Sequence, residues 1–165
     1  MDLQTGAADE NRGDEQAATL AWLDAHYRAM PPVAALQLRV GGFDGDVLRL
    51  HAPLASNVND KGCAFGGSLV SLMTLAGWGL TTLRVRAAGL AADVFVADTQ
   101  VRYRAPLYAD LEASAQLAPG LSWAPIIDEL RTRGRVSLDI VARVVLPEGG
   151  DAVRAQARYV AIAKG

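Results

Sequence analysis

The stretch "NVNDKGCAFGGSLVSLMTLAGWGLTTL", residues 57–83, decides the fold of this chain. A polar loop rich in Asn, Asp and Gly leads into "FGGS", and an uncharged apolar run follows. Within this run, apolar residues lie on most faces of a helix, so it predicts a central helix that is buried on most sides. On one face, apolar residues recur at helical spacing: Leu69, Leu72, Met73, Ala76, Leu80 and Leu83.

Residues 63–83 are also long enough to span a bilayer. The four glycines and five hydroxyl residues among them favour a helix wrapped by a sheet inside a folded domain. We therefore expect no membrane segment.

The composition predicts one domain that does not bind nucleic acid. Of 165 residues, 51% are hydrophobic, which is enough for one core. The 16 basic and 18 acidic residues leave a net charge of -2 and no broad basic footprint. A single cysteine, Cys63, allows no internal disulfide, so a reducing cytoplasm is the expected location. Residues 1–15 are acidic and lack an apolar core, which predicts a disordered lead-in to a domain at 16–165.

The segments on either side of the central helix predict an α+β fold. A short helix is expected at 16–29, ended by "MPP", and then a hairpin of strands at 33–40 and 46–52. After the central helix we expect a loop with a helical turn at 119–134. Four further strands are predicted, within residues 93–106, 110–118, 135–147 and 152–163. This order predicts an antiparallel sheet wrapped round one long helix.

That order, with a glycine pair opening the central helix, resembles the hot-dog fold of acyl-thioester enzymes over residues 30–163. One branch, the thioesterases of the phenylacetate-pathway type, carries an Asn, then His-Gly-Gly six residues later, and a carboxylate nine residues after the His. On this chain those positions hold Asn59, Phe65-Gly66-Gly67 and Thr74.

The resemblance implies that the groups that hold a thioester carbonyl are kept, and that those that hydrolyse it are lost. The Asn59 amide and the Gly66 backbone N–H are the predicted donors to the carbonyl oxygen. Phe65 cannot form hydrogen bonds, and Thr74 is a poor base without an activating neighbour. The predicted substrate contacts are Phe65, Gly67, Ser68, Thr74 and Asp60.

A longer string, "APLASNVNDKGCAFGGSLVSLMTLAGWGL" at 52–80 with "VRYRAP" at 101–106, resembles one family more closely. This is the malonyl-acyl-carrier-protein decarboxylase family, a hot-dog domain found alone or fused to an acetyltransferase and formerly labelled a thioesterase. The resemblance implies release of carbon dioxide from a malonyl thioester to give an acetyl primer for fatty-acid synthesis. No cofactor is expected, because the substrate itself carries phosphopantetheine.

Two other functions stay open. Asp60, the only carboxylate in the loop, could activate water in an acyl-coenzyme A or acyl-carrier-protein thioesterase, although pairing with Lys61 is its simpler role. A non-catalytic acyl-thioester binding protein is the third hypothesis.

Several neighbouring residues have ordinary structural interpretations. Phe65 could be core, Thr74 could bond back to its own helix, and Asn57 is read as a turn residue. Ser68 is expected to cap the helix and Cys63 to be a buried filler. His26 and His51 are too few to build a metal site from familiar spacings, so none is predicted.

The expected partners are an acyl carrier protein or coenzyme A thioester and a second copy of the chain. Hot-dog domains generally pair across a two-fold axis, which implies at least a homodimer through "VADTQVRYR" at 96–104. By the same resemblance Asp98 and Thr99 are secondary site candidates. An acidic carrier would require a basic patch round the pocket. The available residues are Arg84, Arg86, Arg102, Arg104, Arg131, Arg133 and Arg135.

Overall fold

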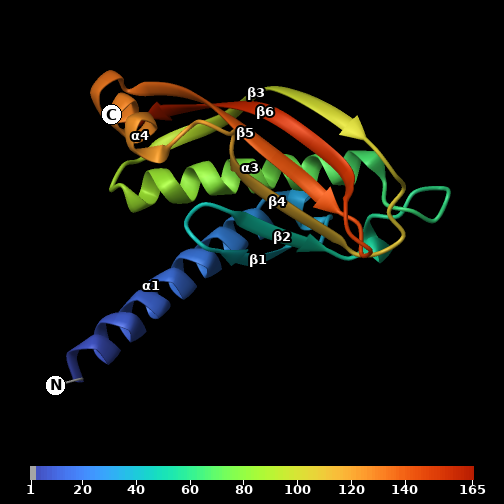
Figure 1. Ribbon diagram of the computed structural model, residues 1–165, viewed down its shortest axis with the longest axis horizontal. Coiled ribbons are helices and arrows are strands. Elements are labelled where there is room, and N and C mark those ends of the chain that lie inside the picture. The colour runs from blue at the N-terminus through green and yellow to red at the C-terminus, as the bar shows by residue number, and fades with distance from the viewer. Residues whose placement is uncertain (1–2) are drawn as a thin grey trace.

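The computed structural model describes residues 3–165, with side chains from residue 13 onward (Figure 1). The elements are α1 (Leu3–Arg28), α2 (Pro31–Ala34), β1 (Arg39–Phe43), β2 (Leu48–Ala52), a 3-10 turn (Leu54–Ser56), α3 (Gly66–Ala87), β3 (Ala92–Tyr103), β4 (Leu111–Leu117), α4 (Trp123–Arg133), β5 (Arg135–Val145) and β6 (Asp151–Ala163).

One six-stranded sheet curves round α3, in the order β1-β2-β4-β5-β6-β3 (Figure 1). All neighbouring strands pair in antiparallel fashion, which confirms the predicted α+β plan. β3, which is twelve residues long, pairs with β6 on one side with a bulge between Val96 and Asp98, and its other side is a sheet edge. Among residues 3–165, no helix combines the length and apolar character needed to cross a membrane.

The central helix is buried as the apolar spacing predicts. All six apolar residues predicted to line one face are at most 4% exposed. They pack against inward-facing side chains of the sheet such as Leu50, Ala113 and Ile140, which are also buried. Burial of this kind contributes roughly 1.5–3 kcal/mol per large aliphatic side chain.

Two buried tyrosines fix α3 within this core. Tyr159 of β6 donates its hydroxyl to the carbonyl of Thr74 at 2.8 Å, and Tyr27 of α1 donates to the carbonyl of Leu75 at 2.6 Å. Only glycine leaves room for these hydroxyls. A Cβ at Gly77 would lie 2.4 Å from the Tyr159 oxygen, and one at Gly79 would lie 2.1 Å from the Tyr27 oxygen.

The N-terminal helix is much longer than the predicted segment at 16–29. It begins at Leu3, so residues 3–15 are helical where a disordered lead-in is expected; residues 1 and 2 lie outside the described part. Residues 3–15 have no proline and contain Leu, Gln, Ala, Glu and Arg, which are good helix formers, although Gly6 and Gly13 are not. The first half of α1 projects away from the sheet in Figure 1, while Leu23 and Tyr27 near its end are fully buried.

Two other expectations about the elements need correction. The first strand is not at 33–40, because Val33 lies in α2 and the strand starts at Arg39. Pro31 and Pro32 favour a helix start, and that preference outweighs the apolar pattern. The predicted loop at 119–134 holds an eleven-residue helix, α4, which ends at Gly134 in the left-handed conformation.

The buried tyrosines predict a specific alkaline instability. Burial raises the pKa of both Tyr27 and Tyr159 above the ordinary value of 10.0. As the pH rises, the unfolded chain therefore loses the hydroxyl protons of these tyrosines before the folded chain does. Their contribution to stability is complete below about pH 10 and falls above it, by about 1.4 kcal/mol per pH unit for each tyrosine.

We expect Tyr159→Phe to be about 1 kcal/mol less stable than the wild type at pH 8, since it loses one hydrogen bond, and less sensitive to pH above 10. Urea unfolding followed by circular dichroism between pH 8 and 12 measures both effects. Tyr108→Phe, at an exposed position, is the matched control. Equal pH slopes for wild type and Tyr159→Phe would contradict the prediction.

Candidate active site

The loop before α3 is a small hairpin whose strands meet in register. The N–H of Phe65 donates to the carbonyl of Asn57 at 2.7 Å, Val58 bridges Ala64, and the N–H of Asn59 donates to the carbonyl of Cys63 at 2.8 Å. Gly62, with φ of 81°, allows the tip to turn. This hairpin delivers the chain directly into the first turn of α3.

Asn57 holds the hairpin to the rest of the fold. Its side chain is 2% exposed, and Nδ2 donates to the carbonyls of Leu36 at 2.9 Å and Pro53 at 2.8 Å. These bonds join the hairpin to the segments before β1 and after β2. Asn57 is thus a structural anchor and not a group directed at a substrate.

Asn59, the predicted donor, also shapes the hairpin. Its Oδ1 accepts from the N–H groups of Lys61 at 2.8 Å and Cys63 at 3.2 Å. Its Nδ2 lies 3.2 Å from the Sγ of buried Cys63, which is a weak acceptor. Nδ2 carries two hydrogens, and no other described atom accepts from it. One amide hydrogen of Asn59 thus has no described acceptor, while the rest of its side chain is fixed.

Asp60 lies away from the start of α3. Its side chain is 80% exposed at the hairpin tip and pairs with the Lys61 Nζ at 2.8 Å. This position favours the simple pairing role over the predicted substrate contact, and it does not support activation of water by Asp60. The turn geometry that directs Asp60 outward is set by Asn59 and Gly62.

The first turn of α3 has no cap. No described side chain caps the helix at Phe65, so the expected capping by Ser68 is not observed. No described group accepts from the N–H of Gly66, Gly67 or Ser68. Three free N–H groups at the positive end of a 22-residue helix form a preorganised site for a carbonyl oxygen or an anion.

Two aromatic rings lie close to the glycine pair at the helix start. Tyr103 at the end of β3 donates its hydroxyl to the carbonyl of Gly66 at 3.0 Å. The Phe65 ring lies so close that a Cβ at Gly67 would be 2.4 Å from it. Phe65 is 54% exposed, so it is not core but an apolar wall over the helix start.

Thr74 is distant from these donors within one chain. It follows Gly66 by eight residues, or about 12 Å along the helix axis. Its carbonyl accepts from Tyr159, and its hydroxyl makes none of the expected bonds back to the helix; Thr81 makes such a bond instead. Gly66 and Thr74 of the same chain therefore cannot both contact one reacting atom.

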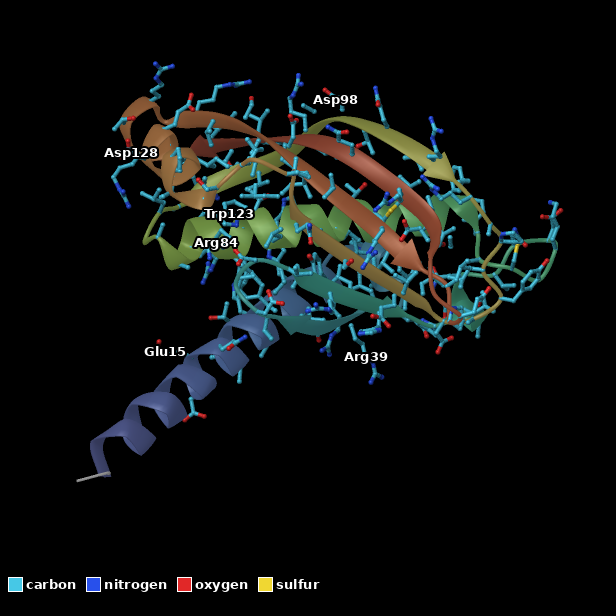
Figure 2. The ribbon with its side chains drawn as sticks, viewed as in Figure 1. Glu15, Arg39, Arg84, Asp98, Trp123 and Asp128 are labelled. Carbon is cyan, nitrogen blue, oxygen red and sulfur yellow. The ribbon has the colours of Figure 1, made fainter. Side chains whose placement is uncertain are left out.

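The predicted basic patch is divided between the two ends of α3. Arg84 lies over Trp123 of α4 at 5.2 Å (Figure 2). Arg86 lies over Trp22 at 3.9 Å. Arg131, Arg133 and Arg135 belong to the same end through α4 and the start of β5. Because α3 is about 33 Å long, none of these five lies near its N-terminus. Only Arg102 and Arg104, on either side of Tyr103, remain close to the helix start.

The two secondary site candidates, Asp98 and Thr99, do not lie together either. Asp98 and Thr99 are neighbours on β3 and so point to opposite faces of the sheet. Asp98 pairs with Arg158 at 3.8 Å, whereas Thr99 shares the face of inward-pointing Ala157. His26 stacks on Trp78 at 5.2 Å and His51 packs over Gly41. The described side chains hold no cluster of three metal-ligating residues.

Chemically, this arrangement can stabilise negative charge on a bound oxygen. It offers N–H donors and the Asn59 amide, with apolar and hydroxyl groups from Phe65 and Tyr103 beside them. Residues 57–68 contain no histidine, and their one carboxylate, Asp60, is paired in solvent. No local pattern within "VRYRAP" singles out Tyr103, because its hydroxyl reaches Gly66 only through the fold.

A sheet wrapped round one helix, with an open helix N-terminus beside the edge strand, is the hot-dog fold of the thioesterase superfamily. The family described as "Putative thioesterase (yiiD_Cterm)" matches residues 22–163, and the chain belongs to this family.

Solved structures agree with this assignment. A protein of unknown function from Chlorobaculum tepidum is 25% identical, with a TM-score of 0.83 over 90% of this chain and 97% of that one. A Shewanella oneidensis protein that is named as a thioesterase is 26% identical, with a TM-score of 0.78 over 88% of this chain and 99% of that one. A Haemophilus influenzae thioesterase shares the fold at 16% identity, with a TM-score of 0.69 over 87% of this chain and 90% of that one.

Proposed function

We propose that this protein removes carbon dioxide from a malonyl thioester and releases an acetyl thioester. The observation that carries the proposal is the uncapped start of α3, which offers donors for a thioester oxygen while residues 57–68 hold no histidine and no carboxylate except the paired Asp60. Family membership supports an acyl-thioester substrate, held on coenzyme A or on a carrier protein. In fatty-acid synthesis the product would serve as the primer.

The reaction needs charge stabilisation and not a base. The bond between the carboxylate carbon and the methylene carbon breaks, and carbon dioxide leaves. The electron pair of that bond forms an enolate whose negative charge collects on the thioester oxygen. The N–H of Gly66 and the Asn59 amide donate to that oxygen, and each such donor is worth about 100-fold to 1,000-fold in rate. A proton from solvent then completes the acetyl methyl group.

The replaced signature residues suit this reaction. A carboxylate at position 74 would repel the malonyl carboxylate in a poorly screened site, and Thr74 removes that repulsion. Phe65 provides an apolar surface at the helix start, which favours loss of a charged group as neutral gas. Hydrolysis would require an activated water, and the residues around Gly66 offer no histidine to activate it.

Hydrolysis of an acyl thioester is the second candidate function. The family description and the name of the Shewanella oneidensis structure favour it. A binding protein without turnover is the third, and the same open helix N-terminus would serve it.

We further propose that two copies of the chain complete the site. The free edge of β3 is twelve residues long and has exposed apolar side chains, Phe95, Val96 and Tyr103. Such an edge is a template for pairing with another strand. Since Gly66 and Thr74 of one chain are about 12 Å apart, a substrate that meets both would contact Thr74 of a second copy.

The products of malonyl-carrier protein decide between the functions. We expect acetyl-carrier protein and carbon dioxide when the purified protein is incubated with malonyl-carrier protein and the mixture is resolved by mass. Free malonate with an unloaded carrier would instead establish hydrolysis. Tight binding without any product would identify a binding protein.

Asn59→Asp tests the donor role while it preserves the hairpin. The aspartate keeps the oxygen that accepts from Lys61 and Cys63, but it has no amide hydrogen for the substrate. We expect kcat to fall about 100-fold or more. Asp60→Asn, one residue away at the exposed tip, is the control and should retain most activity. If Asp60→Asn lost more activity than Asn59→Asp, the thioesterase hypothesis would be favoured.

The dimer proposal predicts that a charge on the β3 edge separates the subunits. Val96→Lys places a cation on the free edge and should shift the mass measured by light scattering from dimer towards monomer. Ile162→Lys adds the same charge on β6, an interior strand, and should leave the dimer intact. A monomeric wild type, or equal effects of both substitutions, would disprove pairing through β3.

A further inference from the structure

The outer face of the sheet, turned away from α3, carries polar side chains in ordered rows. In these rows, side chains from adjacent strands stand directly opposite one another. One row alternates in charge: Arg158 stands between Asp98 and Asp139, with ion pairs of 3.8 and 3.4 Å. Figure 2 shows Asp98 on this side of the sheet. This row is electrostatically balanced in the way expected of a solvated surface.

Four residues further along the strands, a second row has charges of one sign. Arg154 of β6 stands directly between Arg102 of β3 and Arg143 of β5. We call these three residues the arginine row. Like charges directly opposite one another destabilise a sheet. The fold therefore retains an unfavourable arrangement, although the row four residues away on the same strands shows that a balanced one is possible.

The arginine row is only partly neutralised within the chain. Asp151 pairs with Arg154 at 2.7 Å and Arg143 at 3.6 Å, and no other described carboxylate lies within 4 Å of the row. All three arginines are exposed, as is nearby Arg104. They line an open groove of about 850 Å³ together with Ser114, Gln100, Gln116 and Gln156. The groove thus has excess positive charge on a chain whose net charge is -2.

We propose that the arginine row docks an acidic helix of the carrier protein that delivers the thioester. Adjacent strands are about 4.8 Å apart, and one turn of a helix rises about 5.4 Å. A helix laid across β3, β6 and β5 would place one carboxylate per turn over each arginine. Charge complementarity favours a partner with several negative charges in line. The identity of the partner as a carrier protein rests on the proposed function.

The position of the row connects it to the candidate active site. Arg102 and Arg104 flank Tyr103, whose hydroxyl contacts the carbonyl of Gly66 at 3.0 Å. The row and the helix start thus lie on opposite faces at the same end of β3. A carrier held at the row would therefore contact Arg102, one residue from the strand end that meets the start of α3.

A binding experiment with labelled, phosphopantetheine-bearing carrier protein tests the proposal without relying on turnover. The variant Arg102→Gln/Arg143→Gln removes two charges and leaves Arg154 paired with Asp151. The control Arg135→Gln/Arg158→Gln removes two charges from the same strand surface outside the row. We expect the dissociation constant, measured by fluorescence anisotropy at low salt, to rise about tenfold in the row variant and less than about twofold in the control.

Three outcomes would overturn the proposal. They are equal binding of carrier protein by the wild type and the row variant, equal losses in the row variant and the control, or a rise in the dissociation constant of coenzyme A as large as that of the carrier protein. The last would identify a nucleotide-phosphate site instead. Failure of the proposed function is seen separately. If the row variant binds the carrier more weakly but the wild type forms no acetyl product, docking is upheld and decarboxylation is refuted. If acetyl product forms but the row variant binds the carrier as tightly as the wild type does, decarboxylation is upheld and docking is refuted.

Discussion

The structure depends on the contact between two tyrosine hydroxyls and the backbone of the central helix. Tyr27 and Tyr159 donate to adjacent carbonyls of α3, one from α1 and one from β6. Neither contact would be possible with a side chain at Gly77 or Gly79, because its Cβ would clash with the tyrosine hydroxyl. Glycine inside a helix costs about 1 kcal/mol relative to alanine, so the two hydrogen bonds and close packing must offset that cost. The position of α3 along its own axis follows from these bonds.

Once α3 is held in this way, the position of its N-terminus is settled and so is the candidate site. The hairpin anchored by Asn57 meets the helix at Gly66, and Tyr103 contacts the same residue from the edge strand. The uncapped N–H groups are then fixed in space before any ligand arrives. Preorganisation of this kind makes donors effective in stabilising a developing negative charge.

Charge is distributed in this protein by strand register and not by overall composition. The chain is slightly acidic, yet strand pairing aligns Arg102, Arg154 and Arg143 on one face while Asp98 and Asp139 enclose Arg158 nearby. The two rows lie four residues apart on the same strands. Since the side-chain period of a strand is two residues, the register alone decides which charges become neighbours.

The sequence determined the central helix, the α+β class and the loss of the hydrolytic signature. The helical spacing of apolar residues from Leu69 to Leu83 identifies a buried helix, because a helix buried on several faces needs apolar residues at that spacing. The replacement of His and a carboxylate by Phe65 and Thr74 can be read directly from the sequence. Local signals were less reliable where two preferences competed. The apolar run from Val33 predicts a strand, but the prolines before it start a helix.

Only the tertiary structure decided which polar groups are available. Asn59 and Asp60 are adjacent and equally polar, yet one is fixed against Cys63 and the other is exposed and paired with Lys61. The contact of Tyr103 with Gly66 joins residues 37 positions apart, and the arginine row joins three strands. No local pattern encodes such contacts, because they arise from strand register and helix packing. The sequence thus determined the kind of site, and the fold decided which side chains reach it.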